Sequence, residues 1–337
     1  LPSFPSPRRD LPAMRPFEII VTAGPALFPP GRLERMVELG ATIVRLNGAH
    51  LDWSRSGEIL ADLRRRIGSA RLLLDLSGRK VRMTALPGPL RFEAGDPVEL
   101  ARGHLNFPEV FDQAAAGDQG TAVDGIIRMQ GERAAPEGMT LRALTAGTLS
   151  NGKGFHCGKP GLKLPPISLE EEARIRAVGK AVDLFGLSFV HGPGAVDHVQ
   201  ACLGDVDPRR ILPKIETAEA LAHLGAIVAR AGEVLIDRGD LASEIGMART
   251  VPAVREVIRS CKQAGKPVYL ATHFLRSMVE NPVPTMSEYF DLSAALSWGV
   301  DGIQFSDETA IGAHPERCLQ ILREAIGSDC PIAIFRR

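Results

Sequence analysis

The stretch LLLDLSGRKVRM, residues 72–83, has the form of a buried β-strand that stops at an acid and then turns positive. Apolar residues surround Asp75, a Ser-Gly pair follows, and Arg79, Lys80 and Arg82 come within the next seven positions. A carboxylate in an apolar strand is costly to bury unless other groups meet it. This strand end therefore predicts a place where charged side chains, and a charged ligand, come together.

Seven other short runs rich in Ile, Val and Leu share this form. The eight runs are residues 18–22, 42–47, 71–76, 184–190, 211–216, 234–240, 267–272 and 302–308. Helical patterns follow the runs, as at residues 31–40, 168–181 and 314–326. Apolar strands that alternate with helices indicate a parallel sheet buried on both faces, and eight such units predict a (β/α)8 TIM barrel.

One spacing interrupts this rhythm after the third strand. Residues 84–163 are rich in Gly and Pro, carry short alternating runs such as DPVELA, and show little helical periodicity. We expect a small β-rich domain here that covers the C-terminal mouth of the barrel. Removing it leaves about 257 of the 337 residues, close to the roughly 250 of a barrel. The predicted division is an irregular arm at 1–16, barrel at 17–83, insert at 84–163 and barrel again at 164–337.

The composition excludes several classes of protein. Forty basic and forty acidic residues cancel, so no overall charge favours nucleic acid or an anionic membrane. The five cysteines are scattered without a CxxC pair, which indicates a reducing compartment and neither a disulfide framework nor structural zinc. We find no apolar run near the roughly 20 residues of a membrane helix, and the Pro-rich start does not have the form of a signal peptide. We therefore expect a cytoplasmic protein.

Polar residues interrupt the apolar strands mainly at their C-terminal ends, where active sites of this fold lie. They are Thr22, Arg45, Asn47, Asp75, Ser188, Lys214, Glu216, Asp237, Asp240, Thr272, Ser306 and Glu308. Any one of them alone could form a salt bridge at the barrel rim. Polar groups delivered to one mouth by so many strands instead predict a functional site.

The segment LPKIE gives the sharpest local signal. Lys214 and Glu216 are two apart in a strand and therefore point to the same side. With Asp240 just past the next strand, Glu216 forms a sparse oxygen site suited to Mg²⁺ or Mn²⁺. The alternative is an ion network of Lys214, Glu216 and Asp240 without metal.

The segment NGKGFHCG, residues 151–158, has the glycines of a phosphate loop. It follows no clear strand and opens no helix, so we interpret it as a hinge between domains. His156 and Cys157 beside it are then incidental rather than metal ligands.

Several segments together resemble the pyruvate kinase family, in the order expected of it. They are VTAGPA (21–26), RLNGAH (45–50), LLLDLSGRKVR (72–82), LPKIE (212–216), DRGDLASEIG (237–246), KPVYLATHFLRSMVENPVPTMSEYFD (266–291) and FSDETAIGAHP (305–315). The resemblance implies a (β/α)8 barrel with a lid inserted after strand three, over about residues 17–326. It also implies that the family's C-terminal α/β domain is missing, and it suggests a homodimer through the barrel.

By this resemblance, Glu216 and Asp240 hold the divalent metal, Lys214 stabilises the transferring phosphoryl group or the enolate, and Thr272 lies where a proton reaches the enolate. The backbone N–H groups of Gly239 and Asp240 hold the substrate carboxylate. Further substrate- or phosphate-binding positions are Arg45, Asn47, His50, Asp75, Lys80, Arg82, Ser188, Ser306 and Glu308. The implied substrates are phosphoenolpyruvate, or a close enol phosphate, and ADP, which give a 2-oxo acid and ATP.

Three positions predict that potassium is not required. Most of the family carries a Thr and a Glu after the strand-three aspartate to build a potassium site, and this chain has Leu76 and Lys80 there. Ala49 replaces a usual Ser ligand. The pattern resembles family members in which a lysine ammonium takes the place of the potassium ion. A fixed cation near Asp75 would replace the bound ion in this way.

Other departures leave the substrate open. Arg79, His273 and Asp307 add charge where the family has none. One alternative is therefore a metal-dependent lyase, an aldolase or decarboxylase of 2-oxo acids that needs the enolate site but no nucleotide. A silent sensor is a third possibility, against which the intact set of Lys214, Glu216, Asp240 and Thr272 argues.

Overall fold

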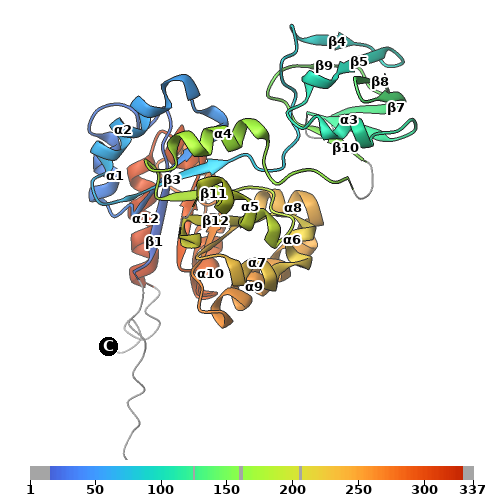
Figure 1. Cartoon of the computed structure of the whole chain (residues 1–337). Coiled ribbons are helices and arrows are strands. Elements are labelled where there is room, and N and C mark those ends of the chain that lie inside the picture. Colours follow the sequence, from blue (N-terminus) through green and yellow to red (C-terminus); the bar gives the residue numbers. More distant parts are fainter. Residues whose placement is uncertain (1–15, 124–125, 159–161, 205–206, 329–337) are drawn as a thin grey trace, which may run out of the picture.

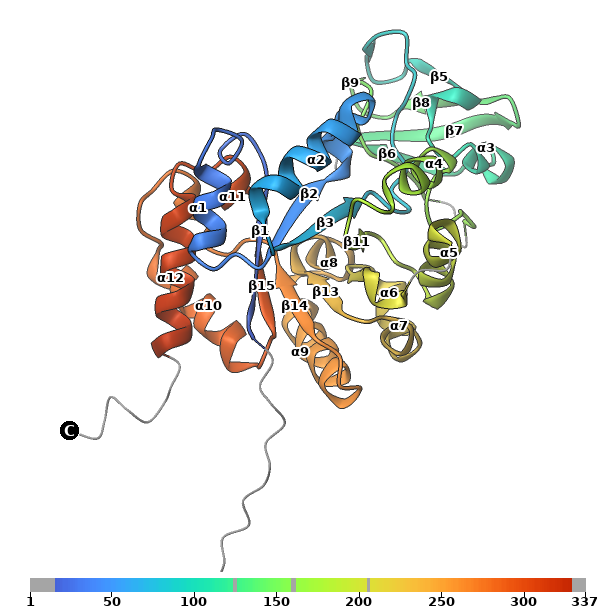
Figure 2. The same cartoon turned by 60° about the vertical axis from the view of Figure 1, so that its left-hand side comes forward.

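The main body of the chain is a closed barrel of eight parallel strands surrounded by helices (Figures 1 and 2). The structure, a computed structural model, describes residues 16–123, 126–158, 162–204 and 207–328. In barrel order the strands are β1 (Glu18–Thr22), β15 (Gly302–Phe305), β14 (Val268–Ala271), β13 (Val234–Asp237), β12 (Ile211–Ile215), β11 (Leu184–Leu187), β3 (Arg71–Leu76) and β2 (Ile43–Asn47). The predicted (β/α)8 barrel is confirmed. The arm predicted for residues 1–16 lies, but for Pro16, outside the described residues.

Helices and short 3₁₀ turns connect successive strands. The α-helices are α1 (Arg32–Glu38), α2 (Ser56–Ile67), α4 (Leu169–Val178), α5 (Pro193–Leu203), α6 (Ala218–Ala222), α7 (Leu224–Arg230), α8 (Arg238–Ile245), α9 (Met247–Gln263), α10 (Met286–Ser297), α11 (Asp307–Ala310) and α12 (Pro315–Ser328). The 3₁₀ turns are η1 (Gly48–His50), η2 (Trp53–Arg55), η4 (Pro208–Arg210) and η5 (Arg276–Val279). The apolar stripes of the helices pack on the outward side chains of the strands and form the largest core of the molecule.

The interior of the barrel has its own apolar layer. It consists of Ile20, Ile43, Leu73, Leu184, Leu212, Leu235, Tyr269 and Ala271, and every one of them is buried. Below this layer Arg71 bridges Glu18 at 2.9 Å and Glu233 at 2.7 Å. The N-terminal end of the barrel is thereby closed by ion pairs, and its C-terminal end faces the insert.

The insert between β3 and β11 forms a separate β unit, drawn in teal and green in Figure 1. Its elements are β4 (Leu90–Phe92), β5 (Pro97–Ala101), η3 (Arg102–His104), α3 (Glu109–Gln113), β6 (Gln119–Ala122), β7 (Ile127–Ala135), β8 (Gly138–Ala143), β9 (Gly147–Leu149) and β10 (Phe155–Cys157). Five strands pair in the order β10-β6-β7-β8-β5, and β4 pairs with β9. Its apolar core also contains Val81 and Met83, upstream of the predicted boundary at residue 84, because Arg82 and Met83 form bridges to Gly154 and Leu105.

Candidate active site

Strand periodicity places the polar side chains directly above the apolar layer of the barrel. Residues two apart in a strand face the same side. The residue two positions after a member of the apolar layer therefore points into the mouth of the barrel. The pairs are Ile20 and Thr22, Ile43 and Arg45, Leu73 and Asp75, Leu212 and Lys214, and Leu235 and Asp237. All five polar members are buried. Their shared level in the barrel explains why residues from distant segments meet.

Lys214 lies at the centre of a ring of carboxylates. Its Nζ is 3.2 Å from Glu216 Oε2, 3.4 Å from Asp237 Oδ2 and 3.7 Å from Asp75 Oδ2, and it donates to Ser188 Oγ at 3.2 Å. Burial opposes its charge, but the attraction of the three carboxylates outweighs burial and raises the pKa of Lys214. The side chain is therefore a fixed buried cation.

Arg45 and Asp75 form a second buried ion pair beside this ring. The guanidinium donates two hydrogen bonds to Asp75 Oδ2, at 2.6 and 3.1 Å, and one to Thr22 Oγ1 at 3.0 Å. Gly186 of the neighbouring strand makes room for the carboxylate, since a Cβ there would lie 2.4 Å from Asp75 Oδ1. Both side chains are thus held rigidly at the mouth.

The carboxylates fit a divalent cation. Oxygen atoms of Glu216, Asp237 and Asp240 lie within 4.8 Å of one another. Oε1 of Glu216 accepts from the backbone N–H of Phe189 at 2.6 Å, whereas the buried Oε2 has no hydrogen-bond partner, although Lys214 Nζ is close. Burial, reinforced by the neighbouring acids and opposed by Lys214, raises the pKa of Glu216 to about 8. Hard oxygens with this excess of negative charge suit Mg²⁺ or Mn²⁺.

A cavity of about 720 Å³ opens above the cluster, between the barrel mouth and the insert. Of the residues predicted for the site, the cavity is lined by Arg45, Asn47, His50, Asp75, Lys80, Arg82, Ser188, Lys214, Asp237 and Asp240. Asn106, Asn151 and Gly152 of the insert complete the wall. Its size is that of a small-molecule site.

The remaining predicted residues lie outside this lining. Glu216 is buried beside Lys214, and Thr272 reaches the cluster through a hydrogen bond to Asp237 at 2.5 Å. Gly239 packs against Thr272. Glu308 instead accepts a hydrogen bond from the backbone N–H of Ser306 at 2.8 Å. A substrate role for Ser306 and Glu308 stays a prediction.

Two cations after β3 face the cavity from the connection to the insert. Arg82 donates to the carbonyl of Gly152 at 2.9 Å, and its Nε is buried without a hydrogen-bond partner. The Lys80 ammonium lies 4.9 Å from the centre of the Phe189 ring, within reach of a cation–π attraction. Both are placed for an anionic ligand.

The three departures in charge lie away from the cavity lining. Arg79 donates to the carbonyl of Leu162 at 2.5 Å, and Asp307 pairs with Arg276 at 3.4 Å. His273 is exposed. Their extra charges therefore leave the walls of the cavity unchanged.

Sequence reasoning missed one acid of the site, Glu171, and the contacts of another, Asp237, which it listed among the polar strand ends. Asp237 was visible only as a polar strand end, because nothing in its neighbourhood shows that it meets Lys214 and Thr272. Glu171 lines the cavity from the first turn of α4. Its signal was hidden, because acids in a first helical turn are common on solvent-facing helix ends.

Glu171 predicts a pH-dependent stability. It is buried, it accepts from the backbone N–H of Ser77 at 2.6 Å, and burial raises its pKa to about 7. Between pH 4.5 and 7 the folded protein then holds one proton more than the unfolded chain, so this group destabilises the fold as pH rises through that window. Glu171→Gln keeps the oxygen acceptor, and should raise the free energy of unfolding at pH 8 by up to about 3 kcal/mol.

Urea unfolding of both proteins at pH 5 and pH 8 measures this effect. The difference between variant and wild type should be larger at pH 8 than at pH 5. An equal difference at the two pH values would show that the Glu171 pKa is ordinary.

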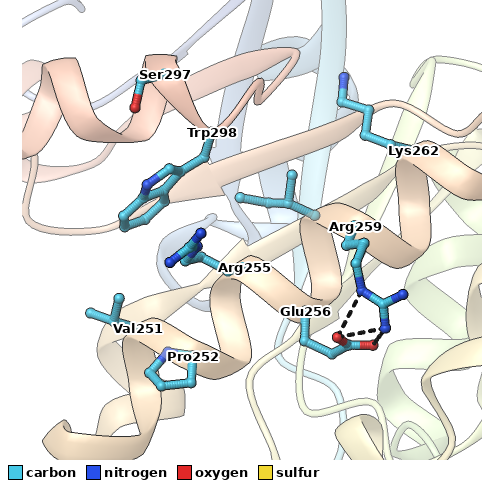
Figure 3. A pocket seen from close by; sticks show the side chains of 9 residues that line it. Val251, Pro252, Arg255, Glu256, Arg259, Lys262, Ser297 and Trp298 are labelled. Atoms are coloured by element: carbon cyan, nitrogen blue, oxygen red, sulfur yellow. Dashed lines mark hydrogen bonds and ion pairs between the residues drawn. The ribbon is translucent and has the colours of Figure 1, made fainter.

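A second cavity, of about 640 Å³, lies outside the barrel between α9 and the end of α10 (Figure 3). Glu256 there pairs with Arg259 at 2.6 Å, and Lys262 pairs with Asp301 at 2.6 Å. None of the residues predicted for the site lines it. This second cavity is therefore separate from the predicted site.

Sequence comparison relates the chain to known proteins. The family model for the barrel domain of pyruvate kinase matches residues 14–319. The chain belongs to the pyruvate kinase family. It is 30% identical to pyruvate kinase PKLR of Homo sapiens, an alignment that covers 96% of this chain and 61% of that protein.

Two microbial pyruvate kinases have a similar sequence identity to the chain and also align with most of it. The enzyme of Agrobacterium vitis is 31% identical over 92% of this chain and 68% of its own length. The enzyme of Thermoplasma acidophilum is 29% identical in an alignment that covers 91% of this chain and 57% of that enzyme. The chain thus spans about three fifths of the length of these relatives.

Proposed function

We propose that the chain transfers a phosphoryl group between phosphoenolpyruvate, or a close enol phosphate, and ADP, giving pyruvate or a related 2-oxo acid and ATP. The observation that carries this proposal is Lys214, a fixed buried cation among carboxylates, at the base of a cavity with further cations on its wall. Phosphoryl transfer depends mainly on positioning and on neutralising charge. The relatives are named pyruvate kinases.

Different residues would position the substrates and neutralise their charge. A divalent metal held by Glu216 and Asp240 would neutralise charge on the substrate oxygens. Lys214 and Arg45 would face the phosphoryl group, and Arg82 would extend the positive wall toward the nucleotide. The substrate carboxylate would meet the backbone N–H groups of Gly239 and Asp240 in the first turn of α8, where a helix favours an anion.

A lyase on the same barrel is the rival function. It would use the enolate chemistry but would leave the cations Lys80 and Arg82 without a phosphate to bind. Two substrates separate the two: the kinase forms pyruvate from phosphoenolpyruvate only when ADP is present, with one ATP for each pyruvate, whereas the lyase forms pyruvate by cleaving a C–C bond of a larger 2-oxo acid and forms none from phosphoenolpyruvate. Cleavage of a 2-oxo acid together with no pyruvate from phosphoenolpyruvate and ADP would rule out the kinase in favour of the lyase.

We also propose that turnover needs no potassium. Lys80 brings a permanent cation to the cavity that Asp75 lines. Replacing K⁺ by tetramethylammonium at constant ionic strength should change the rate less than about twofold. Lys80→Glu should make the rate rise at least about tenfold on adding K⁺, because it replaces the fixed cation by an oxygen ligand. A wild-type rate that depends on K⁺, or a variant that ignores it, would contradict this role.

The cellular location and the oligomeric state of the protein are also proposals. In the described part of the chain no helix combines the length and apolarity needed to cross a membrane, and we propose a cytoplasmic location. Three large apolar residues just before and within the first half of α10 are exposed, namely Val283, Met286 and Phe290, and we propose that they contribute to a homodimer through the barrel. A monomer in sedimentation equilibrium at micromolar concentration would contradict the dimer.

A further inference from the structure

A histidine, a cysteine and a glutamate meet on the outside of the barrel, away from its mouth. Glu172 is on α4, and His198 and Cys202 are on α5. The two helices lie side by side (Figure 2), and one candidate ligand atom of each residue lies within 4.8 Å of the other two. None of these three residues lines the cavity at the barrel mouth, so the proposed reaction does not account for them.

The spacing on α5 suits two ligands of one ion. His198 and Cys202 are four apart, and residues four apart lie on the same face of a helix, one turn from each other. The absence of a CxxC pair argues against a cysteine-rich zinc site, but not against a site built from a single cysteine. Glu172 supplies a third donor from the neighbouring helix.

Hydrogen bonds hold the three donors close together. His198 Nε2 lies 2.8 Å from Glu172 Oε1. Arg176 Nη2 donates to Glu172 Oε2 at 3.0 Å and to Cys202 Sγ at 3.7 Å. Zn²⁺ bonds of about 2.0–2.3 Å place tetrahedral ligand atoms roughly 3.3–3.6 Å apart, so side-chain movements of about 1 Å would bring the three donors to one ion.

The cluster can be reached by a cation from solvent. The side chains of His198 and Glu172 are 35% and 15% exposed, whereas Cys202 is buried. The Arg176 side chain is 58% exposed, so its guanidinium can move outward from its place beside the carboxylate and the thiol. With three protein ligands, the fourth position of a tetrahedral ion would be left to water.

We propose that Glu172, His198 and Cys202 bind one Zn²⁺ ion. Thiolate and imidazole ligands suit Zn²⁺ and distinguish this cluster from the acids at the barrel mouth, whose oxygens suit Mg²⁺. Binding replaces the proton of the thiol, which is released to solvent. The ion joins α4 to α5 and stabilises the folded chain, because the unfolded chain has no preformed site. Neither the site nor its test depends on the proposed phosphoryl transfer.

The same residues could also have a purely structural role. Glu172 could form a surface ion network with Arg176 and His198, and Cys202 could serve as a small apolar residue of the core. Arg176 distinguishes the two roles. In an ion network its guanidinium is a stabilising partner, whereas beside a metal ion it is a competing positive charge.

The experiment uses Co²⁺ as a spectroscopic probe, since a thiolate bound to Co²⁺ gives a charge-transfer absorption in the near ultraviolet. Co²⁺ is titrated into the full chain in excess Mg²⁺, which occupies the acids at the barrel mouth, and Zn²⁺ is then added to displace it. The controls are a buried cysteine of the insert and an exposed histidine of the barrel, replaced in Cys157→Ser and His223→Ala. The test variants are Glu172→Gln, Arg176→Ala, His198→Ala and Cys202→Ser.

Wild type should show the absorption at one Co²⁺ per chain, and Cys202→Ser should show none. Zn²⁺ should raise the midpoint of thermal unfolding of wild type but not of Cys202→Ser. His198→Ala and Glu172→Gln should bind Zn²⁺ at least about tenfold more weakly than wild type, and both controls should stay within about twofold of it.

Arg176→Ala should bind Zn²⁺ at least about threefold more tightly than wild type, because a positive charge beside the ion is removed. A misfolded variant would not give this gain. No thiolate absorption in wild type, an absorption that persists in Cys202→Ser, or weaker Zn²⁺ binding by Arg176→Ala would each overturn the proposal.

Discussion

Lys214→Met is expected to lower the rate of pyruvate formation by about 10²–10³-fold or more, the cost of removing a charge that stabilises a transition state. The ammonium is the only group that lies within 4 Å of Asp75, Glu216 and Asp237 together among the described ion pairs. Met has a similar length and no charge, so it removes the cation with little change in shape. Divalent-cation binding should persist or become tighter, because three carboxylates lose their shared counterion.

Steady-state kinetics and Mn²⁺ binding on the same variant separate these effects. The stability of the variant is followed by thermal unfolding, since loss of one partner of a buried ion pair costs about 3–5 kcal/mol. Lys180→Met, on the exposed end of the α4 segment, is the matched control. A Lys214→Met rate within tenfold of wild type would remove Lys214 from the mechanism.

Glu216→Gln is expected to weaken divalent-cation binding at least about tenfold and to lower turnover with it. The amide keeps the shape and can still accept from Phe189 N–H, so the fold around it should persist. What it loses is a carboxyl group that can release its proton and offer a charged oxygen to the cation, with Oε2 as the buried oxygen without a hydrogen-bond partner. Excess Mg²⁺ should restore part of the activity.

Titration of Mn²⁺ into wild type, Glu216→Gln and the distant Asp301→Asn measures the effect directly. Removal of metal by a chelator should also abolish turnover of the wild type, and added Mg²⁺ should restore it. Equal Mn²⁺ affinity for wild type and Glu216→Gln would place the metal elsewhere.

The barrel and the base of its site follow from sequence periodicity. Apolar strands alternating with helices predicted the eight-stranded barrel, and the two-residue spacing placed Lys214 and Glu216 on one side. Asp75 and Arg45 were predicted at the same mouth for the same reason. These are local patterns, and the closed barrel turns them into one site.

The remaining features depend on contacts between distant segments. The bond from Thr272 to Asp237 joins residues 35 positions apart, and the positive φ of Thr272 leaves no trace in its neighbours. Ser306 and Glu308 end a strand as Lys214 does, yet a local backbone hydrogen bond holds Glu308. A sequence pattern predicts which strand end carries a polar group, but not which neighbour that group meets.

The most direct test of the proposed phosphoryl transfer follows phosphorus itself. ³¹P NMR of the chain with phosphoenolpyruvate, ADP and Mg²⁺ should show the phosphoenolpyruvate signal replaced by the signals of ATP, and Lys214→Met should show neither change on the same time scale. Loss of phosphoenolpyruvate with release of inorganic phosphate, or no loss in protein that binds Mg²⁺, would contradict the account.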